Sequence, residues 1–370
     1  MQDRSINGSL AERLRERILR EGAISFRDWM EAALYDPREG YYCRPNLPRW
    51  GRAGDYRTSP ERSPLFAATF AQYFSTLYEK LGNPPAWTIL EAGAGAGHFA
   101  CGVLETLRRL RPDVFAATRF LIDEASADAE RRARNRLSPF DDRVEYRRLD
   151  EIGTPIEQGV IFSNELLDAF PVHRVTLRSG RLCELCVGLA DSGEFNWVER
   201  EPTTPRLGAY LERARVHLDE GQIIEINLAA EEWMARAARA LKRGYLITID
   251  YGAEADELYN APHRRFGTLR AFHQHRIMDD ALARPGEQDI TTTIDWTRMR
   301  EVGEEHGLRT IGLERQDQFL LRVGLLDQLE LMTAELSGDA EAMILRASAR
   351  EMILPGGSSA SFQVLVQKRA

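Results

Sequence analysis

The sequence predicts an α/β protein built around a doubly wound parallel sheet, with a helical N-terminal extension and an inserted antiparallel β segment. Two observations carry this prediction. Short apolar segments alternate with helical patterns from residue 87 to residue 163 and again from residue 222 onward, which is typical of parallel sheets. Between residues 172 and 199, three apolar segments follow one another with only short turns between them, which indicates an antiparallel meander.

The N-terminal extension is expected to contain helices over residues 9–35 and 65–81. Ser9 and Glu12 have the spacing of a capping box at the start of the first helical stretch. Residues 38–64, in contrast, are rich in glycine, proline and arginine and show little apolar periodicity. A long irregular stretch of this kind in a compact protein often carries function, so we expect it to be functional.

The remaining elements are predicted from their apolar patterns in chain order. The first half of the core supplies strands at residues 87–92, 119–123, 144–149 and 160–163, with helices at 98–110 and 125–137. The insertion supplies strands at 172–177, 181–189 and 194–199, and a helix near 206–217. The second half supplies strands at 222–226, 245–250, 308–313 and 361–367, helices at 228–242, 295–306 and up to about 353, and a loop region at 251–290.

Composition argues against several classes of function. The chain has 370 residues and a formal net charge of −8, and this acidic balance argues against a broad nucleic-acid-binding surface. No run of roughly 18 apolar residues occurs, so no membrane insertion is expected. Four cysteines are too few for a disulfide scaffold, and acidic residues near the N-terminus argue against an organellar targeting peptide. We therefore expect a cytoplasmic protein.

A glycine-rich turn, EAGAGAG at residues 91–97, connects the first core strand to the helix that follows it. Gly93, Gly95 and Gly97 allow a sharp turn and let a ligand approach the helix N-terminus, whose free N–H groups favour an anion. The fingerprint of dinucleotide enzymes requires a third glycine where this chain has His98. The G-x-G-x-G spacing, with Glu91 at the strand end, is similar to the first motif of class I methyltransferases, which bind S-adenosylmethionine. The alternative is a left-handed turn in an unrelated α/β protein.

Acidic residues follow the next two strands. Asp123 and Glu124 end the second core strand, where a carboxylate accepts hydrogen bonds from the ribose hydroxyls of NAD or of S-adenosylmethionine. Glu124 is therefore predicted to bind the ribose, and Asp150, after the third strand, to face the adenine. The alternatives are a solvated acidic pair at a helix N-terminus and a solvated acidic residue in a loop.

The sequence NELLD at residues 164–168 ends the fourth core strand. Ligands of open α/β sheets lie beyond the carboxyl ends of the strands, so Asn164, Glu165 and Asp168 are expected to face the second substrate. Two neighbouring carboxylates suit a cationic group such as a guanidinium, which they can bind through paired hydrogen bonds. The alternative is that Asn164 caps a helix whose first turn contains Glu165.

No metal site is predicted. Cys183 and Cys186 form a C-x-x-C sequence, but in a strand their side chains point to opposite faces. This arrangement suits core packing better than a zinc or redox pair. His273 and His275 lack a third ligand at metal spacing.

Several stretches together resemble the MidA-like S-adenosylmethionine-dependent methyltransferases, a family that includes a mitochondrial complex I assembly factor. The resemblance runs from about residue 24 to the C-terminus and depends on the order and spacing of short motifs. These are FRDWM at 26–30, ALY at 33–35, GYY at 40–42, GDY at 54–56, TSPE at 58–61, the turn at 91–97, NELLD at 164–168, DYG at 250–252, GTLR at 267–270, DIT at 289–291 and FLL at 319–321.

The resemblance implies a class I methyltransferase core in which the N-terminal extension covers the cofactor. In such an arrangement Asp55, Thr58, Ser59 and Pro60 would close over the methionine end of S-adenosylmethionine. The mitochondrial relative methylates an arginine on a protein partner, which agrees with a guanidinium held by the carboxylates after the fourth strand. The chain departs from the family where residues 292–295 read TTID in place of a usual histidine, and where arginines flank the TSPE segment.

We therefore expect three parts. Residues 1–84 form the N-terminal extension and cofactor-covering loop, residues 85–171 and 219–370 the methyltransferase core, and residues 172–218 the inserted segment. The hypothesis is N-methylation of an arginine on a protein partner by in-line methyl transfer, with a homodimer as one option for the assembly. One alternative is N- or O-methylation of a small molecule, with His98 or His173 as the base. Another is a non-catalytic assembly or binding factor on the same fold.

Overall fold

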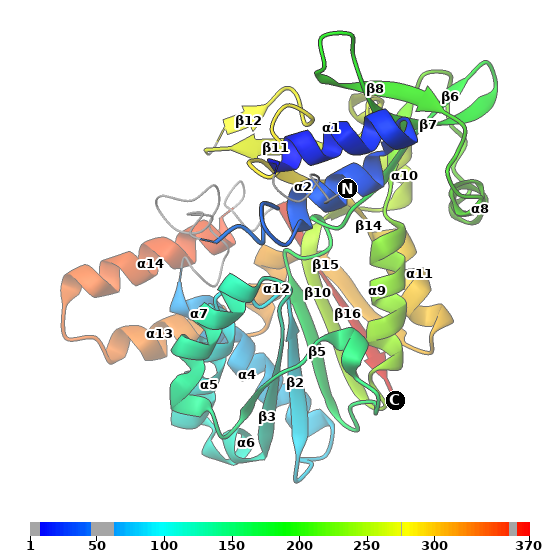
Figure 1. Ribbon diagram of the computed structural model, residues 1–370. Helices are drawn as coiled ribbons and strands as arrows, with labels where there is room; N and C mark the ends of the chain where they lie inside the picture. The colour runs from blue at the N-terminus through cyan, green and yellow to red at the C-terminus, as the bar shows by residue number, and fades with distance from the viewer. Residues whose placement is uncertain (1–7, 46–62, 275, 355–360) are drawn as a thin grey trace.

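The computed structural model describes residues 8–45, 63–274, 276–354 and 361–370. Its centre is a mixed sheet in the order β15-β16-β10-β5-β2-β3-β4, with the short β14 beside β10 (Figure 1). The strands are β2 (Trp87–Ala92), β3 (Thr118–Asp123), β4 (Val144–Tyr146), β5 (Gly159–Asn164), β10 (Gly244–Ala253), β14 (Ile294–Asp295), β15 (Arg309–Arg315) and β16 (Phe362–Arg369).

The strand order confirms the predicted doubly wound fold. From β2 the chain adds β3 and β4 on one side, and then returns to add β5 and β10 on the other, all in parallel. β16 runs antiparallel between β10 and β15. This is the class I methyltransferase arrangement, and the order of the strands reverses between β2 and β5, where ligands of such sheets bind.

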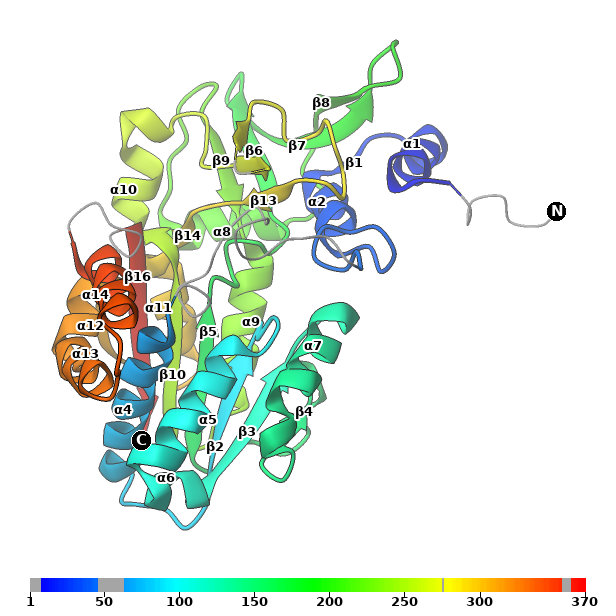
Figure 2. The same cartoon turned by 90° about the vertical axis from the view of Figure 1, so that its left-hand side faces the viewer.

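Helices cover both faces of this sheet (Figures 1 and 2). One face packs against α4 (Pro64–Lys80), α5 (His98–Leu110), α7 (Ala127–Leu137) and the C-terminal helices α12 (Gln316–Arg322), α13 (Leu325–Ala334) and α14 (Asp339–Ile353). The other face packs against α9 (Leu228–Arg239) and α11 (Trp296–Glu305). Aromatic rings fill the first interface: Phe99 of α5 stacks on Phe162 of β5 with ring centroids 4.3 Å apart. This packing fixes α5, and with it the glycine-rich turn, against the sheet.

A second group of elements, the upper unit, lies above the carboxyl ends of the core strands in Figure 1. Its sheet has the order β1-β7-β6-β9, with β8 beside β7. The antiparallel registers of β6, β7 and β8 confirm the predicted meander. The elements are α1 (Leu10–Glu21), β1 (Ile24–Ser25), α2 (Phe26–Tyr35), β6 (His173–Arg178), β7 (Arg181–Leu189), β8 (Phe195–Arg200), α8 (Arg206–Ala214) and β9 (Ile223–Ile226).

The N-terminal extension and the insertion share one hydrophobic core within the upper unit. Leu10 and Leu14 of α1 and Trp29 of α2 pack with Val172 and Val187, all of them buried. β1 also pairs with β7. The division of the chain into three parts remains a prediction, and these contacts join its first and third parts.

Several predicted boundaries were wrong. Residues 251–290 are not one loop region, because they contain α10 (Ala255–Asn260) and the short strands β11 (Arg270–His273), β12 (Arg276–Met278) and, at their end, β13 (Asp289–Thr291). The strand expected at 144–149 ends at Tyr146, and a helix α6 (Pro112–Ala117) precedes β3. The two missed helices have six residues each and the three missed strands have three or four, which is too short to show a clear period in the sequence. Within the described ranges, every helix is too short or too polar to span a bilayer.

Asn227 joins the start of α9 to the loop that follows β5. Its side-chain Oδ1 accepts a hydrogen bond from the Ala230 N–H at 2.8 Å, and its Nδ2 donates to the Leu167 carbonyl at 3.0 Å. Asn227→Ala is expected to lower the free energy of unfolding by about 1–2 kcal/mol, because both the helix cap and this link are lost. Urea unfolding measures it. Asn135→Ala, at an exposed site within α7, is the control and should change stability by less than about 0.5 kcal/mol; equal effects would contradict the assignment.

Candidate active site

The glycine-rich turn has the conformation that its sequence predicts. Gly93, Gly95 and Gly97 all have positive φ, at 70°, 55° and 75°, a region that other residues rarely adopt. Gly97 is the N-cap of α5. The N–H of Gly93 donates to the carbonyl of Asp123 at 2.8 Å, and the N–H of Gly95 donates to Glu124 Oε2 at 2.7 Å. The turn is therefore bonded to the end of β3.

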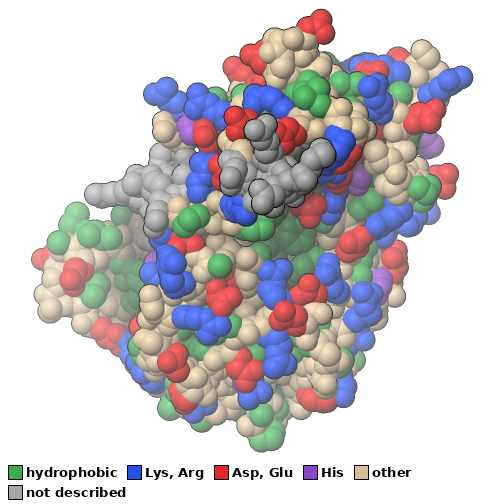
Figure 3. All heavy atoms as spheres, viewed as in Figure 1, with side chains coloured by type: hydrophobic (Ala, Val, Ile, Leu, Met, Phe, Trp, Pro, Cys, Tyr) green, Lys and Arg blue, Asp and Glu red, His purple; other side chains and the backbone are tan. Residues whose placement is uncertain are grey.

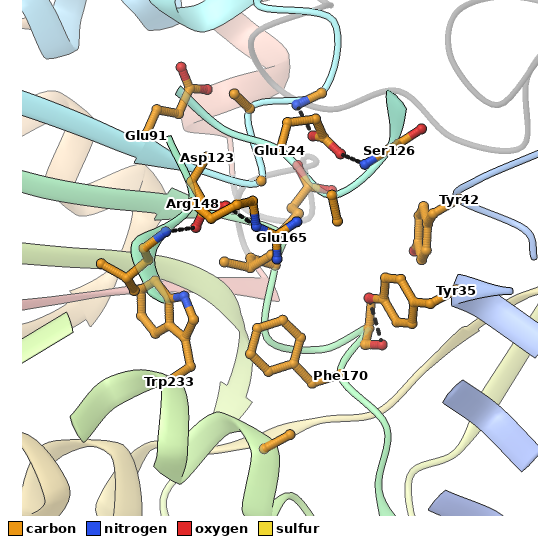
Figure 4. A pocket seen from close by; sticks show the side chains of 18 of the residues that line it. Tyr35, Tyr42, Glu91, Asp123, Glu124, Ser126, Arg148, Glu165, Phe170 and Trp233 are labelled. Atoms are coloured by element: carbon orange, nitrogen blue, oxygen red, sulfur yellow. Dashed lines mark hydrogen bonds and ion pairs between the residues drawn. The ribbon is translucent and has the colours of Figure 1, made fainter. Parts of the chain in front are cut away.

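A pocket of about 490 Å³ opens beside this turn, at the carboxyl ends of β2, β3 and β5. The turn and the ends of these strands form one side of it, and α2 and α9 contribute the opposite walls (Figure 4). In the space-filling view the face of the molecule is hollowed between the upper unit and the core, with basic and acidic side chains around the hollow (Figure 3). The predicted residues Glu91, Gly93, Gly95, Glu124 and Asp150 line the pocket, whereas Gly97 is not among its described lining residues.

Two of the lining carboxyl groups have raised pKa values. Burial, and after it the neighbouring Glu124, raises the pKa of Glu91 well above its usual value, and Glu91 Oε2 has no hydrogen-bond partner among the described residues. Burial also raises the pKa of Glu124 to about 7, although N–H groups of Ser126 and Gly95 bind its oxygens. Glu124 therefore titrates near neutral pH, and each of its oxygens retains a lone pair for a ligand.

The other wall contains residues that the sequence alone did not single out. Trp233 and Arg236 of α9 line the pocket, and Arg148 Nε lies 3.0 Å from Asp123 Oδ1 (Figure 4). Asp123 Oδ2 also accepts a hydrogen bond from the Leu149 N–H at 3.2 Å. The spacing of apolar residues in α9 predicts a helix, but which of its residues face a ligand depends on how the helix packs on the sheet.

The loop after β5 presents Glu165 to the pocket in a left-handed conformation. Glu165 has a φ of 53°, and its Oε1 accepts a hydrogen bond from Asn164 Nδ2 at 3.0 Å. The buried Asp250, at the same level on β10, accepts hydrogen bonds through Oδ2 from three successive N–H groups of this loop. These are the N–H groups of residues 166–168, at 3.2, 2.8 and 3.2 Å. Asp250 therefore fixes the loop that carries Glu165.

The structure separates the residues predicted to face the second substrate. Asn164 and Glu165 line the pocket, whereas Asp168 is 5% exposed and is not among the described residues of the pocket wall. Burial, and then repulsion from Asp250, raises the pKa of Asp168 well above its usual value. Burial and the neighbouring carboxylates thus favour the neutral form of Asp168, whereas Glu165 lies on the pocket wall. The sequence could not reveal this, because residue spacing does not report desolvation.

Two tyrosines of the upper unit close the pocket on its far side. Tyr35 of α2 donates a hydrogen bond from its hydroxyl to the Ala169 carbonyl at 3.1 Å, and Tyr42 donates to Asp289 Oδ1 at 2.6 Å. Both tyrosines line the pocket (Figure 4). Their only signal in the sequence was the motif resemblance around residues 33–42.

The remaining candidates are less informative about the site. Asp55, Thr58, Ser59 and Pro60 lie outside the described residues. Cys183 and Cys186 are free thiols on β7. Burial, together with the charge of Arg136, lowers the pKa of His98 to about 4, so His98 is a weak base at neutral pH.

Comparison with known proteins agrees with this architecture. A family model described as "Putative S-adenosyl-L-methionine-dependent methyltransferase" matches residues 69–314. A similar protein of Drosophila melanogaster, the mitochondrial protein arginine methyltransferase NDUFAF7 homolog, is 27% identical over 89% of this chain and 78% of its own length. The human mitochondrial protein arginine methyltransferase NDUFAF7 is 24% identical, over 84% of this chain and 72% of its own length.

A solved structure extends the similarity to nearly the whole chain. A protein from Burkholderia thailandensis, crystallised with S-adenosyl-homocysteine, superposes with a TM-score of 0.86 and 31% sequence identity, covering 97% of this chain and 92% of that one. Its bound ligand is the product that S-adenosylmethionine leaves after methyl transfer.

Proposed function

This chain belongs to the family of S-adenosyl-L-methionine-dependent methyltransferases, and we propose that its methyl acceptor is an arginine side chain of a protein partner. The observation that carries the proposal is the position of Glu165, whose carboxylate is held by the loop after β5 on the wall of an acidic pocket (Figure 4). The distant relatives named protein arginine methyltransferases support the same acceptor.

The charge of the pocket favours a cationic acceptor. Among the described residues, its lining contains seven carboxyl groups, of Glu31, Glu91, Asp123, Glu124, Asp150, Glu165 and Glu232, but three guanidinium groups, of Arg27, Arg148 and Arg236. Even with Glu91 neutral, the carboxylates outnumber the cations. A guanidinium entering such a site exchanges water for charge-assisted hydrogen bonds.

The residues of the pocket fit S-adenosylmethionine, the cofactor of this family. Gly93 and Gly95 line the pocket beside the N-terminus of α5, and Gly97 packs the turn against α7, where an added Cβ would lie 3.1 Å from the Ala133 Cβ. We propose that Gly93, Gly95 and Gly97 hold the methionine end, where the unpaired Glu91 Oε2 can accept hydrogen bonds. Glu124 would bind the ribose hydroxyls. Asp150 would face the adenine, beside Trp233.

When bound, the cofactor supplies a methyl group that its sulfonium charge has already activated. The protein then has to position the acceptor nitrogen, and alignment can contribute roughly 7–11 kcal/mol to catalysis in favourable cases. Glu165 would bind the guanidinium and keep its positive charge away from the attacking nitrogen, since the pKa of a guanidinium lies far above neutral pH and its outright deprotonation is expensive. Tyr35 and Tyr42 would limit the access of water from the upper unit.

The decisive experiment follows a labelled methyl group. The protein and methyl-labelled S-adenosylmethionine are added to an extract of the native cells from which the gene has been deleted, and the protein and small-molecule fractions are separated. We expect the label in protein, recovered as methylarginine after hydrolysis. Label in small molecules, or in another amino acid, would contradict the arginine proposal while leaving the methyltransferase activity in place.

Binding of S-adenosylhomocysteine is expected to depend on pH through Glu124. Only the ionised carboxylate can accept hydrogen bonds from both ribose hydroxyls, so the Kd should rise about fivefold from pH 7 to pH 6 and about tenfold for each further unit, for a group with a pKa of about 7. The pKa of Glu124 in the folded protein lies above its ordinary value of 4.5. Protonation of Glu124 therefore contributes to the free energy of unfolding of the ligand-free protein, fully below pH 4.5, and this contribution is lost as the pH rises through about 7.

Calorimetry between pH 5.5 and pH 8 measures this dependence. Glu124→Gln is the control: it should bind more weakly than the wild type at pH 8, and its Kd should no longer change with pH in this way. An unchanged pH profile in Glu124→Gln would remove Glu124 from the ribose site.

A further inference from the structure

A second cavity adjoins the cofactor pocket. It has a volume of about 490 Å³ and lies between α1, α2, the start of β6 and the start of α9. Arg27, Pro171, Ala229 and Glu232 line both cavities, so the two are neighbours along one wall. The second cavity has no role in the proposed binding of the cofactor, and it contains a histidine with an unusual set of partners.

His173, at the start of β6, lines this cavity and is 8% exposed. Its Nδ1 lies 2.7 Å from Oε1 of Glu184, which is fully buried on β7. Oε2 of Glu184 in turn accepts hydrogen bonds from the backbone N–H and the hydroxyl of Thr203, both at 2.7 Å. The carboxylate therefore fixes the orientation of the imidazole from behind.

These contacts determine which nitrogen of His173 carries the proton. Burial alone would raise the pKa of Glu184, but hydrogen bonds from His173 and Thr203 outweigh it and lower this pKa. The ionised carboxylate requires a donor at Nδ1, so in the neutral imidazole Nε2 is an acceptor. Nε2 has no hydrogen-bond partner among the described residues.

The charged side chains of the second cavity are paired with one another. Arg17 lies 2.9 Å from both Glu21 and Asp28, and Arg206 lies 2.5 Å from Glu232. Because these charges are paired, the cavity has no large excess of positive or negative charge. What it presents to a ligand is a hydrogen-bond acceptor, His173 Nε2, in a fixed orientation.

We propose that the second cavity binds the residue next to the acceptor arginine, and that His173 Nε2 accepts a hydrogen bond from the side chain of that residue. This inference rests on the proposed function, because it requires a polypeptide acceptor that extends past Pro171 and Ala229. It assigns His173 a role in substrate selection, distinct from the role of Glu165 in the cofactor pocket.

The alternative to a role in substrate selection is a purely structural one. Glu184 and His173 would then hold the segment around Thr203 to the sheet and would have no effect on which ligand binds. Glu184→Gln separates the two roles. The Thr203 N–H can only donate, so the amide oxygen of glutamine must face it, and the amide NH₂ must then face His173 Nδ1. Nδ1 becomes the acceptor and Nε2 acquires the proton, so the selectivity of the cavity should reverse.

The test measures the binding of labelled arginine peptides to the S-adenosylhomocysteine-loaded protein by fluorescence anisotropy. The residue flanking the arginine is varied in two pairs. Tryptophan, which only donates a hydrogen bond, is compared with its analogue naphthylalanine, and methionine sulfoxide, which only accepts one, is compared with methionine. At one flanking position the wild type should prefer tryptophan over naphthylalanine by about two- to tenfold. His173→Leu should lose this preference, and Glu184→Gln should instead prefer methionine sulfoxide over methionine. His217→Leu, at an exposed site outside both cavities, should behave as the wild type.

Nitrogen NMR of histidine-labelled protein reports the tautomer directly, with the proton on Nδ1 in the wild type and on Nε2 in Glu184→Gln. An unchanged preference in His173→Leu, or the same tautomer in both proteins, would overturn the proposal. The same peptides with lysine in place of arginine separate this inference from the proposed function. If only the lysine peptides bind, with the same preference for a donor, the arginine acceptor is wrong but the second cavity is still a substrate site. If no peptide of either kind shows the preference, the second cavity is not a substrate site.

Discussion

Glu165→Gln is expected to lower methyl transfer to an arginine acceptor by about 10²–10³-fold, the usual cost of removing one preorganised electrostatic contact at the reacting group. Glutamine has the same shape and tolerates the same backbone, so the loop held by Asp250 should keep its conformation. The loss should therefore appear in the transfer step and not in the affinity for S-adenosylhomocysteine. Single-turnover transfer of a labelled methyl group and calorimetry measure the two quantities separately.

Asp168→Asn provides the contrast. Asp168 is buried, its pKa is raised, and it is not among the described residues of the pocket wall, so an amide of the same shape should lower transfer by less than about tenfold. Glu157→Gln, at an exposed carboxylate paired with Lys242, should leave transfer unchanged. Equal losses in Glu165→Gln and Asp168→Asn would support the paired-carboxylate hypothesis that the sequence suggested.

Gly97→Ala should weaken the binding of S-adenosylhomocysteine by about 10–100-fold, or about 1.4–2.8 kcal/mol. At a φ of 75° an alanine carries a backbone strain of about 1–2 kcal/mol. Its Cβ would also lie 3.1 Å from the Cβ and 3.2 Å from the Cα of Ala133, neither of which can move away easily. The turn would shift, and the Gly95 N–H would lose its position beside Glu124.

Gly82→Ala is the matched control for backbone strain. Gly82 has a φ of 89°, and an added Cβ would meet no atom within 4 Å. Both variants should lower the free energy of unfolding, but only Gly97→Ala should also lose affinity for the ligand. Comparable affinities in the two variants, measured by calorimetry, would mean that the glycine-rich turn is not a cofactor cradle.

The fold and the cofactor side of the site follow closely from local sequence signals. Glycines at alternate positions between a strand and a helix predict the turn. The position of Glu124 at the end of the next strand predicts that its carboxylate lies beside that turn. The structure brings Gly95 and Glu124 within 2.7 Å. These local signals predict a contact in the folded protein because adjacent parallel strands place their carboxyl ends at the same edge of the sheet.

The part of the site that would bind the methyl acceptor could be predicted only in part, because its properties depend on residues distant in the chain. Asp250 binds a loop that precedes it by more than 80 residues, and Tyr35 reaches the Ala169 carbonyl from α2. Whether Asp168 is charged depends on its burial beside Asp250, which no local pattern records. The same holds for His173, whose importance becomes visible only through Glu184 and Thr203.

The upper unit has a consequence for the evolution and redesign of this enzyme. The glycine-rich turn and the ends of β2 and β3 belong to the core sheet, whereas α2, Tyr35 and the cavity around His173 belong to a separately packed layer with its own apolar core. On the proposed function, we expect mutations around His173 in that layer to change the choice of acceptor, because His173 lies outside the cofactor pocket. A library intended to retarget the enzyme should therefore vary α2 and the start of β6, and keep Glu165 and Asp250 fixed.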